Sequence, residues 1–324
     1  MSVVPISPCA SARDDQATRL RAMLGAHGAE RGAQSPIIAL PRPKLIALAS
    51  GKGGVGKTFT SISLASAFAE LGKRTVLVDT DFGAANADIM LGLAPLRRLD
   101  ECFVKSFARG HSLNDIAIDS GAGFRLIPGP VGMGRPPAAA DRNKLVSSIS
   151  QLHEDTDVVL MDCSAGVGPC VLDLVAAADL AVIVLTPEPT SIADAYALIK
   201  SLIRKQGPGA AESIGLIVNQ AESRNEAERV HRRIAAVATR FLGVTLPLFG
   251  RIPADKAVSR GIRAQRIAQG GKLRSSSGRS VRRAAKIVIE QLETQSVSGG
   301  VRLRSDARGT QRAVSTSLGL AGGR

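Results

Sequence analysis

Short apolar runs recur along the chain between residues 45 and 250, separated by longer stretches that have room for a helix. Most runs are rich in Val, Ile and Leu and end at a Gly, Pro, Asp or Asn, as strands buried in a sheet do. Strands that alternate with helices favour an α/β fold, with a mostly parallel sheet and helices on both faces. The seven predicted strands are residues 45–49, 75–79, 124–128, 158–162, 180–185, 214–219 and 246–250.

The same pattern divides the chain into three segments. Residues 1–43 contain five prolines around one short helical stretch, so we expect a flexible N-terminal segment. Residues 44–292 carry all seven runs and are long enough to form one domain with a large core. After a last helix, over about residues 279–292, residues 293–324 are rich in Gly, Ser and Arg, and we expect a disordered basic tail.

Residues 51–58 read GKGGVGKT, directly after the first apolar run, and match the phosphate-loop pattern G-x-x-x-x-G-K-[ST] in full. The glycines leave backbone N–H groups free to surround a phosphate, and the helix that follows points its positive end at the same anion. Lys57 is expected beside the β- and γ-phosphates and Thr58 on Mg²⁺, so the predicted ligands are ATP and Mg²⁺. The nucleotide contacts are assigned to Gly51, Lys52, Gly53, Gly54, Val55, Gly56, Lys57 and Thr58.

Two acidic strand ends follow the loop. The second run leads from Asp79 into Asp81, and the fourth leads from Asp162 into Gly166. Carboxylates at these places can hold the water shell of Mg²⁺ and orient an attacking water. We assign Asp162 and Asp79 to the metal, Asp81 to catalysis with Lys57, and the Gly166 backbone N–H to the γ-phosphate. Taken singly, each aspartate also fits a strand-end turn.

The string KGGVGKT resembles the deviant phosphate loop of the MinD and ParA family. The resemblance implies a MinD-like P-loop NTPase fold. It also implies an ATP-dependent homodimer, in which the extra lysine, Lys52, reaches across the interface to the partner's nucleotide as a catalytic group. The alternative for Lys52 is a solvated surface lysine.

A narrower resemblance is to the FlhG family of flagellar-number regulators, also called FleN or YlxH. It rests on residues 50–93, 186–200 and 250–265, and on DQATRLR at residues 15–21, which is similar to a motif that precedes the ATPase in that family. The resemblance implies an FlhF-like signal-recognition-type GTPase as partner, with a flagellar transcription regulator or switch-complex protein as a further one. The partner-binding residues are then Asp15, Gln16, Ala17, Leu20 and Arg21. Pattern alone favours an ordinary frayed helix there.

The base-binding end rests on the same family comparison. Relatives place an asparagine after a late strand and a proline-aspartate loop around the adenine, and Asn219, Pro253 and Asp255 match those positions. An Asn side chain carries both the donor and the acceptor that an adenine edge needs. The alternative is a turn-forming Asn.

Composition indicates a cytoplasmic protein. The longest apolar candidate, residues 171–186, is too short for a transmembrane helix and contains two aspartates. We see no secretory signal, and four cysteines without metal-ligand spacing suit a reducing compartment.

The net charge is +14, and residues 251–324 carry 16 Lys and Arg against four Asp and Glu. MinD relatives commonly end in an amphipathic membrane helix, and this tail departs from that pattern. The basic residues 251–324 have three alternative interpretations: peripheral contact with anionic lipid, contact with DNA as in ParA-type partition ATPases, or a solvated tail.

Three functions share the predicted ATPase core: an FlhG-like switch, which the N-terminal motif favours, a ParA-type DNA-binding partition ATPase, and a bacterial tyrosine kinase. The kinase is expected to carry a tyrosine-rich tail, and this chain has one tyrosine, Tyr196.

Overall fold

The computed structural model describes residues 42–103, 112–133, 136–152, 155–265, 267 and 275–313. The chain divides into two units, Met1–Leu40 and Pro41–Arg324, and every described residue belongs to the second.

An eight-stranded sheet forms the centre of the second unit, in the order β3-β4-β2-β5-β1-β6-β7-β8. All neighbouring strands are parallel except β3 and β4, which pair antiparallel. The seven predicted strands and the mostly parallel sheet are confirmed. The two-residue β3 has no apolar pattern of its own, and the sequence analysis missed it. The strands are β1 (Lys44–Ser50), β2 (Thr75–Thr80), β3 (Ile118–Asp119), β4 (Arg125–Ile127), β5 (Val158–Ala165), β6 (Leu180–Leu185), β7 (Ile214–Ala221) and β8 (Leu248–Pro253).

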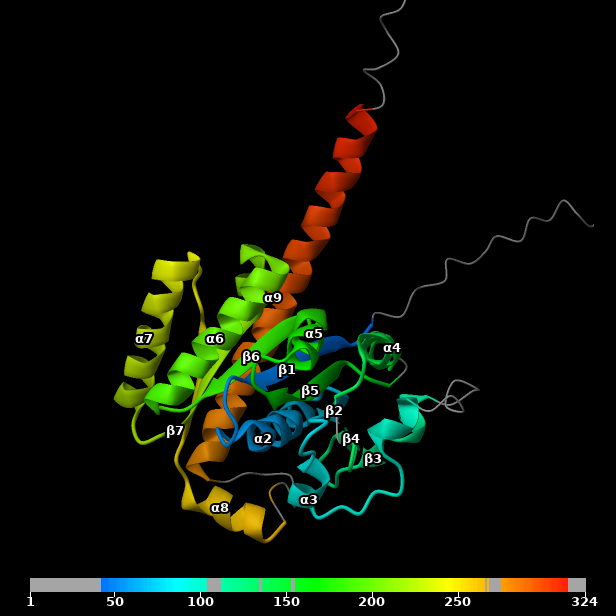
Figure 1. The fold of residues 1–324 in the computed structure, drawn as a ribbon, viewed down its shortest axis with the longest axis vertical. Helices are drawn as coiled ribbons and strands as arrows, with labels where there is room; N and C mark the ends of the chain where they lie inside the picture. Colours follow the sequence, from blue (N-terminus) through cyan, green and yellow to red (C-terminus); the bar gives the residue numbers. More distant parts are fainter. Residues whose placement is uncertain are drawn as a thin grey trace, which may run out of the picture. The chain divides into compact units, whose positions relative to one another are not determined.

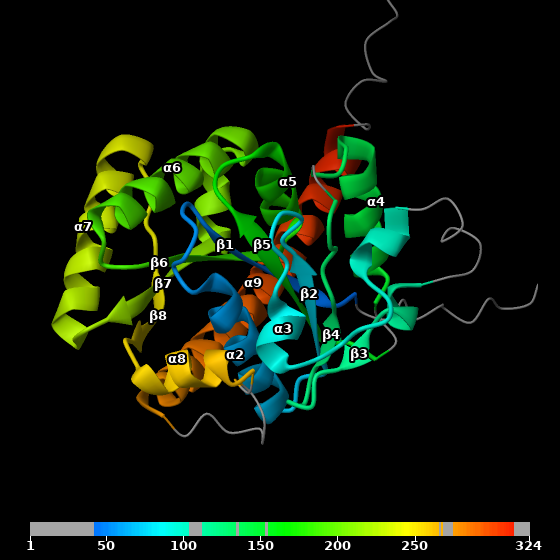
Figure 2. The ribbon, with the colours of Figure 1, turned by 60° about the horizontal axis from the view of Figure 1, so that its bottom comes forward.

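Helices cover both faces of the sheet, as Figures 1 and 2 show. Side chains alternate along each strand, so Leu45 and Ala47 of β1 pack into the core beneath α4 to α7, while Ile46 and Leu48 pack toward α2 and α9. The helices are α2 (Lys57–Glu70), α3 (Ala87–Leu91), α4 (Ala139–Ser150), α5 (Pro169–Ala177), α6 (Pro189–Gln206), α7 (Arg224–Leu242), α8 (Lys256–Arg263) and α9 (Ser276–Ala313), with 3-10 turns at Leu99–Phe103, Leu113–Asp115 and Pro208–Ser213.

The last helix is longer than the one expected from the sequence. We expected a helix over about 279–292 and a disordered tail from 293, but α9 runs from Ser276 to Ala313. Val281, Ala284, Val288 and Leu292 recur at helical spacing and are buried in the core cluster shared with α2 and β8. No proline interrupts residues 276–313, so nothing in the sequence removes a backbone donor from the helix past Leu292. The helix therefore extends past its expected end, and disorder of the tail stays a prediction.

Because β1, β2, β5, β6, β7 and β8 are parallel, their carboxyl ends meet at one edge of the sheet. In open α/β sheets, ligands bind outside that edge. The phosphate loop, both acidic strand ends and Asn219 all lie there, because each follows or ends one of these strands. The fold therefore gathers motifs that are far apart in the sequence.

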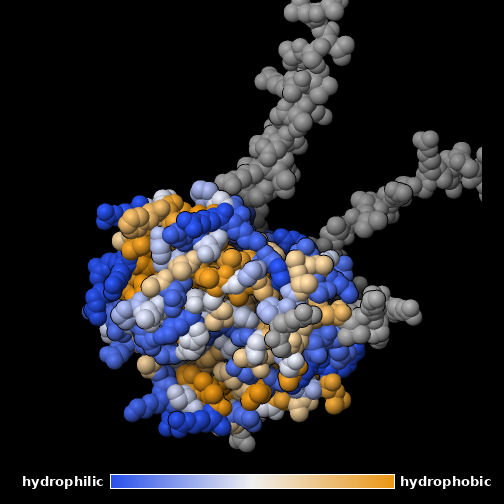
Figure 3. Space-filling view, in the orientation of Figure 1, coloured by the Kyte–Doolittle hydropathy of each residue, from blue (hydrophilic) through white to orange (hydrophobic). Residues whose placement is uncertain are grey.

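Polar side chains cover much of the face in Figure 3, and smaller apolar areas interrupt them. Among the described residues, no helix is both long enough and apolar enough to cross a bilayer.

One close approach inside the core gives a test of the fold. A Cβ atom at Gly215 of β7 would lie 2.0 to 2.4 Å from ring carbons of Phe249 on β8, which is 1% exposed. Gly215→Ala is therefore expected to lower the free energy of unfolding by about 1–3 kcal/mol, because the ring must shift in a packed core. Gly209→Ala is the matched control, since a Cβ atom there meets nothing within 4 Å. Urea unfolding of both variants checks this, and equal midpoints would contradict the packing described.

Candidate nucleotide-binding site

The phosphate loop connects β1 to α2 at the carboxyl edge of the sheet. A Cβ atom at Gly51 would lie 2.1 Å from the backbone of Asp194 in α6, and one at Gly56 would lie 2.3 Å from Asn219 Nδ2. Gly56 also has a φ of 82°, in the left-handed region that favours glycine. Glycine is therefore required at both ends of the loop, which packs closely against α6 and β7 and begins α2.

Lys57 and Asp162 form a buried ion pair beneath this loop, with Lys57 Nζ 2.8 Å from Asp162 Oδ1. The side chains are 7% and 0% exposed. Burial alone would lower the pKa of Lys57, but the attraction of Asp162 more than offsets it, so the pKa is raised. Lys57 is therefore charged, and its ammonium group, which has three N–H donors, can bind an anion in the loop besides Asp162.

The two oxygens of the Asp162 carboxylate differ in their hydrogen bonds. Its Oδ1 accepts hydrogen bonds from Lys57 and from Ser61 Oγ, 2.8 Å away, whereas Oδ2 is buried and has no hydrogen-bond partner among the described residues. The hydroxyl of Thr58, in the first turn of α2, has no recorded partner in the same part of the chain. A hydroxyl and a carboxylate beside a phosphate site are the donors Mg²⁺ accepts, with phosphate oxygens and water completing its shell.

No group of three or more His, Cys, Asp or Glu side chains could hold a metal ion within the described ranges. The Thr58 hydroxyl and the Asp162 carboxylate fit Mg²⁺ bound together with phosphate.

Asp79 is 1% exposed and lies opposite Asp162 in the pairing of β2 with β5. Its Oδ1 accepts from the backbone N–H of Asp81, and its Oδ2 accepts from those of Asn86 and Ala87. Burial first, and then the charge of Asp162, raise its pKa to about 7. In this structure Asp79 holds the loop between β2 and α3, and its role at the metal stays a prediction.

Asp81 lines a cavity of about 820 Å³, together with Gly53 and Ser164. Its Oδ1 accepts from the backbone N–H groups of Gly83 and Ala84 and from Ser164 Oγ. Its position beside the phosphate loop suits the water-orienting role predicted for it.

Gly166 has a φ of 102°, so its backbone conformation favours glycine. Its N–H donates to the carbonyl of Ser50, 2.8 Å away. The predicted contact of this N–H with a γ-phosphate therefore requires the segment after β5 to shift, and it stays a prediction.

Lys52 extends away from Lys57 toward the start of α6. Its Nζ lies 2.6 Å from Glu188 Oε2 and 3.0 Å from Thr190 Oγ1, and the side chain is 38% exposed. This pairing could not be predicted from sequence, because it depends on the packing of the loop against the β6–α6 connection. An exposed ion pair contributes about 1 kcal/mol or less, so Glu188 does not prevent Lys52 from reaching another partner.

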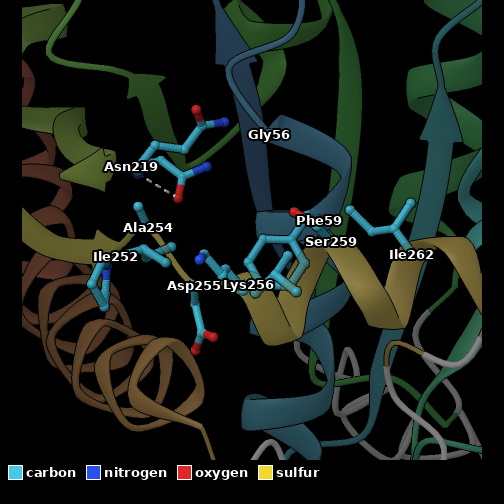
Figure 4. A pocket seen from close by; sticks show the side chains of 12 residues that line it. Gly56, Phe59, Asn219, Ile252, Ala254, Asp255, Lys256, Ser259 and Ile262 are labelled. Carbon is cyan, nitrogen blue, oxygen red and sulfur yellow. Dashed lines mark hydrogen bonds between the residues drawn. The ribbon is translucent and has the colours of Figure 1, made fainter. Parts of the chain in front are cut away.

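A second cavity, of about 420 Å³, is lined by Gly56 of the phosphate loop and by residues of β7, β8 and α8 (Figure 4). Phe59 of α2, Ile252 of β8, and Val258 and Ile262 of α8 supply apolar walls suited to a flat ring. The sequence analysis did not find them, because three separate elements bring them together. The spacing of Val258 and Ile262 on one face of a short helix was the available signal.

The three residues predicted at the base end all line this cavity. Asn219 Nδ2 donates to the carbonyl of Val55, and Asn219 Oδ1 accepts from the backbone N–H of Gln220. Asp255 caps α8 through the N–H of Ala257 and accepts from Ser277 of α9. Asn219 and Asp255 thus fix the walls of the cavity, Pro253 ends β8, and contact with a base remains a prediction for all three.

The N-terminal motif residues Asp15, Gln16, Ala17, Leu20 and Arg21 lie outside the described residues.

Comparison with known proteins identifies the family of the chain. Residues 46–266 match the family described as CobQ/CobB/MinD/ParA nucleotide binding domain. The antiactivator FleN of Pseudomonas aeruginosa is 36% identical over 225 residues, which are 69% of this chain and 78% of FleN. The flagellum site-determining protein YlxH of Helicobacter pylori is 28% identical over 78% of this chain and 83% of its own length.

Among solved structures, the cell division ATPase MinD of Pyrococcus furiosus has a TM-score of 0.61 at 23% identity, covering 76% of this chain and 98% of that one. MinD of Pyrococcus horikoshii, solved with Mg-ADP, has the same TM-score at 24% identity, covering 76% and 96%. These likenesses support the fold. The chain belongs to the CobQ/CobB/MinD/ParA family of nucleotide-binding domains and, within it, to the relatives of FleN and YlxH.

Proposed function

We propose that the chain is an ATP-hydrolysing switch that dimerises when it binds ATP and that regulates flagellar number and placement, as an FlhG-type protein. The observation that carries the ATPase part is the buried Lys57–Asp162 pair beneath the glycine loop, in which one oxygen of Asp162 has no hydrogen-bond partner among the residues that the structure describes. Similarity to FleN and YlxH carries the flagellar part.

In this mechanism the loop and Lys57 bind the β- and γ-phosphates of ATP, while Phe59 and Ile252 enclose the base. Thr58 and Asp162 hold Mg²⁺, which supplies positive charge to the phosphates when it is bound. Asp81 accepts a hydrogen bond from the attacking water. The water oxygen bonds to the γ-phosphorus, the bond to the bridging oxygen of ADP breaks, and a proton leaves with the phosphate product.

Lys52 is assigned to the partner subunit's nucleotide. Its pair with Glu188 is exposed and weak, so the lysine can exchange it for the stronger charge of a triphosphate. A cation supplied in trans stabilises transition-state charge and makes turnover depend on dimerisation. The dimer dissolves once hydrolysis removes the γ-phosphate.

The N-terminal motif at residues 15–21 is the proposed contact with an FlhF-like GTPase. It precedes the first strand, β1, by more than 20 residues, so it need not interfere with the phosphate loop. A flagellar transcription regulator or switch-complex protein is the proposed further partner, and the inner face of the cell membrane the proposed place of action.

The role of Lys52 is tested by ATP turnover per subunit as a function of protein concentration. In the unmodified protein, turnover per subunit is expected to rise with concentration, because the active form is a dimer. Lys52→Ala should keep ATP affinity within about threefold and lose turnover by about 10³-fold or more, as loss of a trans cation does. Lys73→Ala is the control, since Lys73 is similarly exposed and also pairs with a glutamate. If ATP turnover per subunit of Lys52→Ala still rose with protein concentration, as in the unmodified protein, Lys52 would not act on the partner's nucleotide.

The partner assignment is tested by deleting residues 1–35. The truncated protein should hydrolyse ATP at the rate of the full chain, because the nucleotide site begins after β1. It should no longer stimulate GTP hydrolysis by the FlhF-like GTPase of the same organism. Deleting residues 1–12 leaves the motif in place and is the control. Undiminished stimulation by the longer deletion would contradict the assignment.

A further inference from the structure

The carboxylate of Asp81 is held in one orientation by hydrogen bonds that all reach the same oxygen. Oδ1 accepts from the backbone N–H groups of Gly83 and Ala84, at 3.2 and 3.1 Å, and from Ser164 Oγ at 3.0 Å. No hydrogen bond of Oδ2 is recorded within the described part of the chain. Asp81 Oδ1 is thus held by three hydrogen bonds, and Oδ2 can accept a hydrogen bond from a water molecule.

Ser164 differs from the other two donors because it comes from a different strand. Gly83 and Ala84 belong to the loop that Asp81 itself begins, whereas Ser164 lies near the end of β5, 83 residues further along the chain. The bond therefore joins the loop after β2 to the segment after β5. These are the two segments to which the sequence analysis assigned the water-orienting and γ-phosphate contacts.

Ser164 is also related to Asp162 by the geometry of the strand. Both residues belong to β5, two positions apart, at the place where the pairing of β5 with β1 shifts register between Asp162 and Ala165. Asp162 pairs with Lys57, and Ser164 pairs with Asp81. One strand thereby carries both the proposed metal ligand and the residue that donates to the proposed water-orienting carboxylate.

The cavity beside these residues gives water access to them. Asp81 and Ser164 both line it, together with Gly53 of the phosphate loop. Asp81 is partly exposed there, so without an anchor its carboxylate could rotate into other staggered positions. A catalytic group that is free to rotate loses rate, because the reacting geometry is then occupied for only a fraction of the time.

We propose that Ser164 is a positioning residue for Asp81, holding Oδ1 so that Oδ2 faces the attacking water. The proposal rests on the proposed ATPase function and adds a residue that neither the phosphate-loop pattern nor the acidic strand ends identify. Ser164 touches neither nucleotide nor metal in this account. It acts through Asp81 alone.

The test is the steady-state kinetics of Ser164→Ala. We expect kcat to fall about tenfold, while KM and the affinity for ATP stay within about twofold, because the hydroxyl acts in the hydrolytic step and not in binding. Ser164→Thr keeps a hydroxyl and should recover most of kcat. Ser150→Ala is the matched control, since Ser150 Oγ donates to the Val146 carbonyl in α4, away from the site, and its loss should leave kcat unchanged.

A second readout separates positioning from a merely structural role. In an Asp81→Ala background, Ser164→Ala should cause no further loss of kcat, because the group that Ser164 orients is gone. Thermal unfolding of Ser164→Ala within about 2 °C of the unmodified protein would agree with a role in orientation, since losing 1 kcal/mol of stability shifts the midpoint of a chain this large by only a few degrees.

Three results would overturn the proposal: unchanged kcat in Ser164→Ala, no recovery in Ser164→Thr, or an equal loss with and without Asp81. Failure of the proposed function is distinguishable, because then the unmodified protein would not hydrolyse ATP or Asp81→Ala would hydrolyse it normally.

Discussion

The buried ion pair between Lys57 and Asp162 is the interaction on which the site depends. Burying both charges costs desolvation free energy, and a buried ion pair is favourable only when further hydrogen bonds satisfy the charged groups. Here Ser61 Oγ donates such a bond to Asp162 Oδ1. Removing one member of a buried pair typically costs about 3–5 kcal/mol, because the other charge is left without compensation. The pair also fixes the first turn of α2 against β5, so the phosphate loop and the acidic strand end keep a constant separation.

The loop itself is held from several sides. Gly51 packs against the backbone of α6, Gly56 packs against Asn219, and Asn219 in turn donates to the Val55 carbonyl. These contacts prepare the backbone cradle before any phosphate arrives, which lowers the entropy lost on binding. Lys52 is the exception, since it extends from the rigid loop to an exposed partner that it can exchange.

Much of the fold could be predicted because its signals are local. The strands β1, β2 and β5 each follow from a run of apolar residues only a few positions long. The glycine-rich motif likewise predicts the phosphate loop from eight consecutive residues. The helix α9 beyond Leu292 and the short β3 could not be predicted, because their residues have no strong local preference for the structure they adopt.

The candidate site divides in the same way. Lys57, Asp81 and Asp162 follow from motif and strand end, whereas Ser61, Ser164 and Glu188 reach the site only through tertiary packing. Gly166 illustrates the limit: its left-handed backbone agrees with the motif, but its N–H donates to Ser50, which no pattern along the chain could indicate.

The most direct test of the account is the mass in solution of the Asp81→Ala protein, measured by light scattering with Mg-ATP and with Mg-ADP. The account predicts the mass of one chain, 33.7 kDa, with ADP. It predicts twice that mass with ATP, because the variant binds nucleotide but hydrolyses it too slowly to dissolve the dimer during the measurement. The mass of a single chain with both nucleotides would contradict the claim that ATP joins two copies through Lys52.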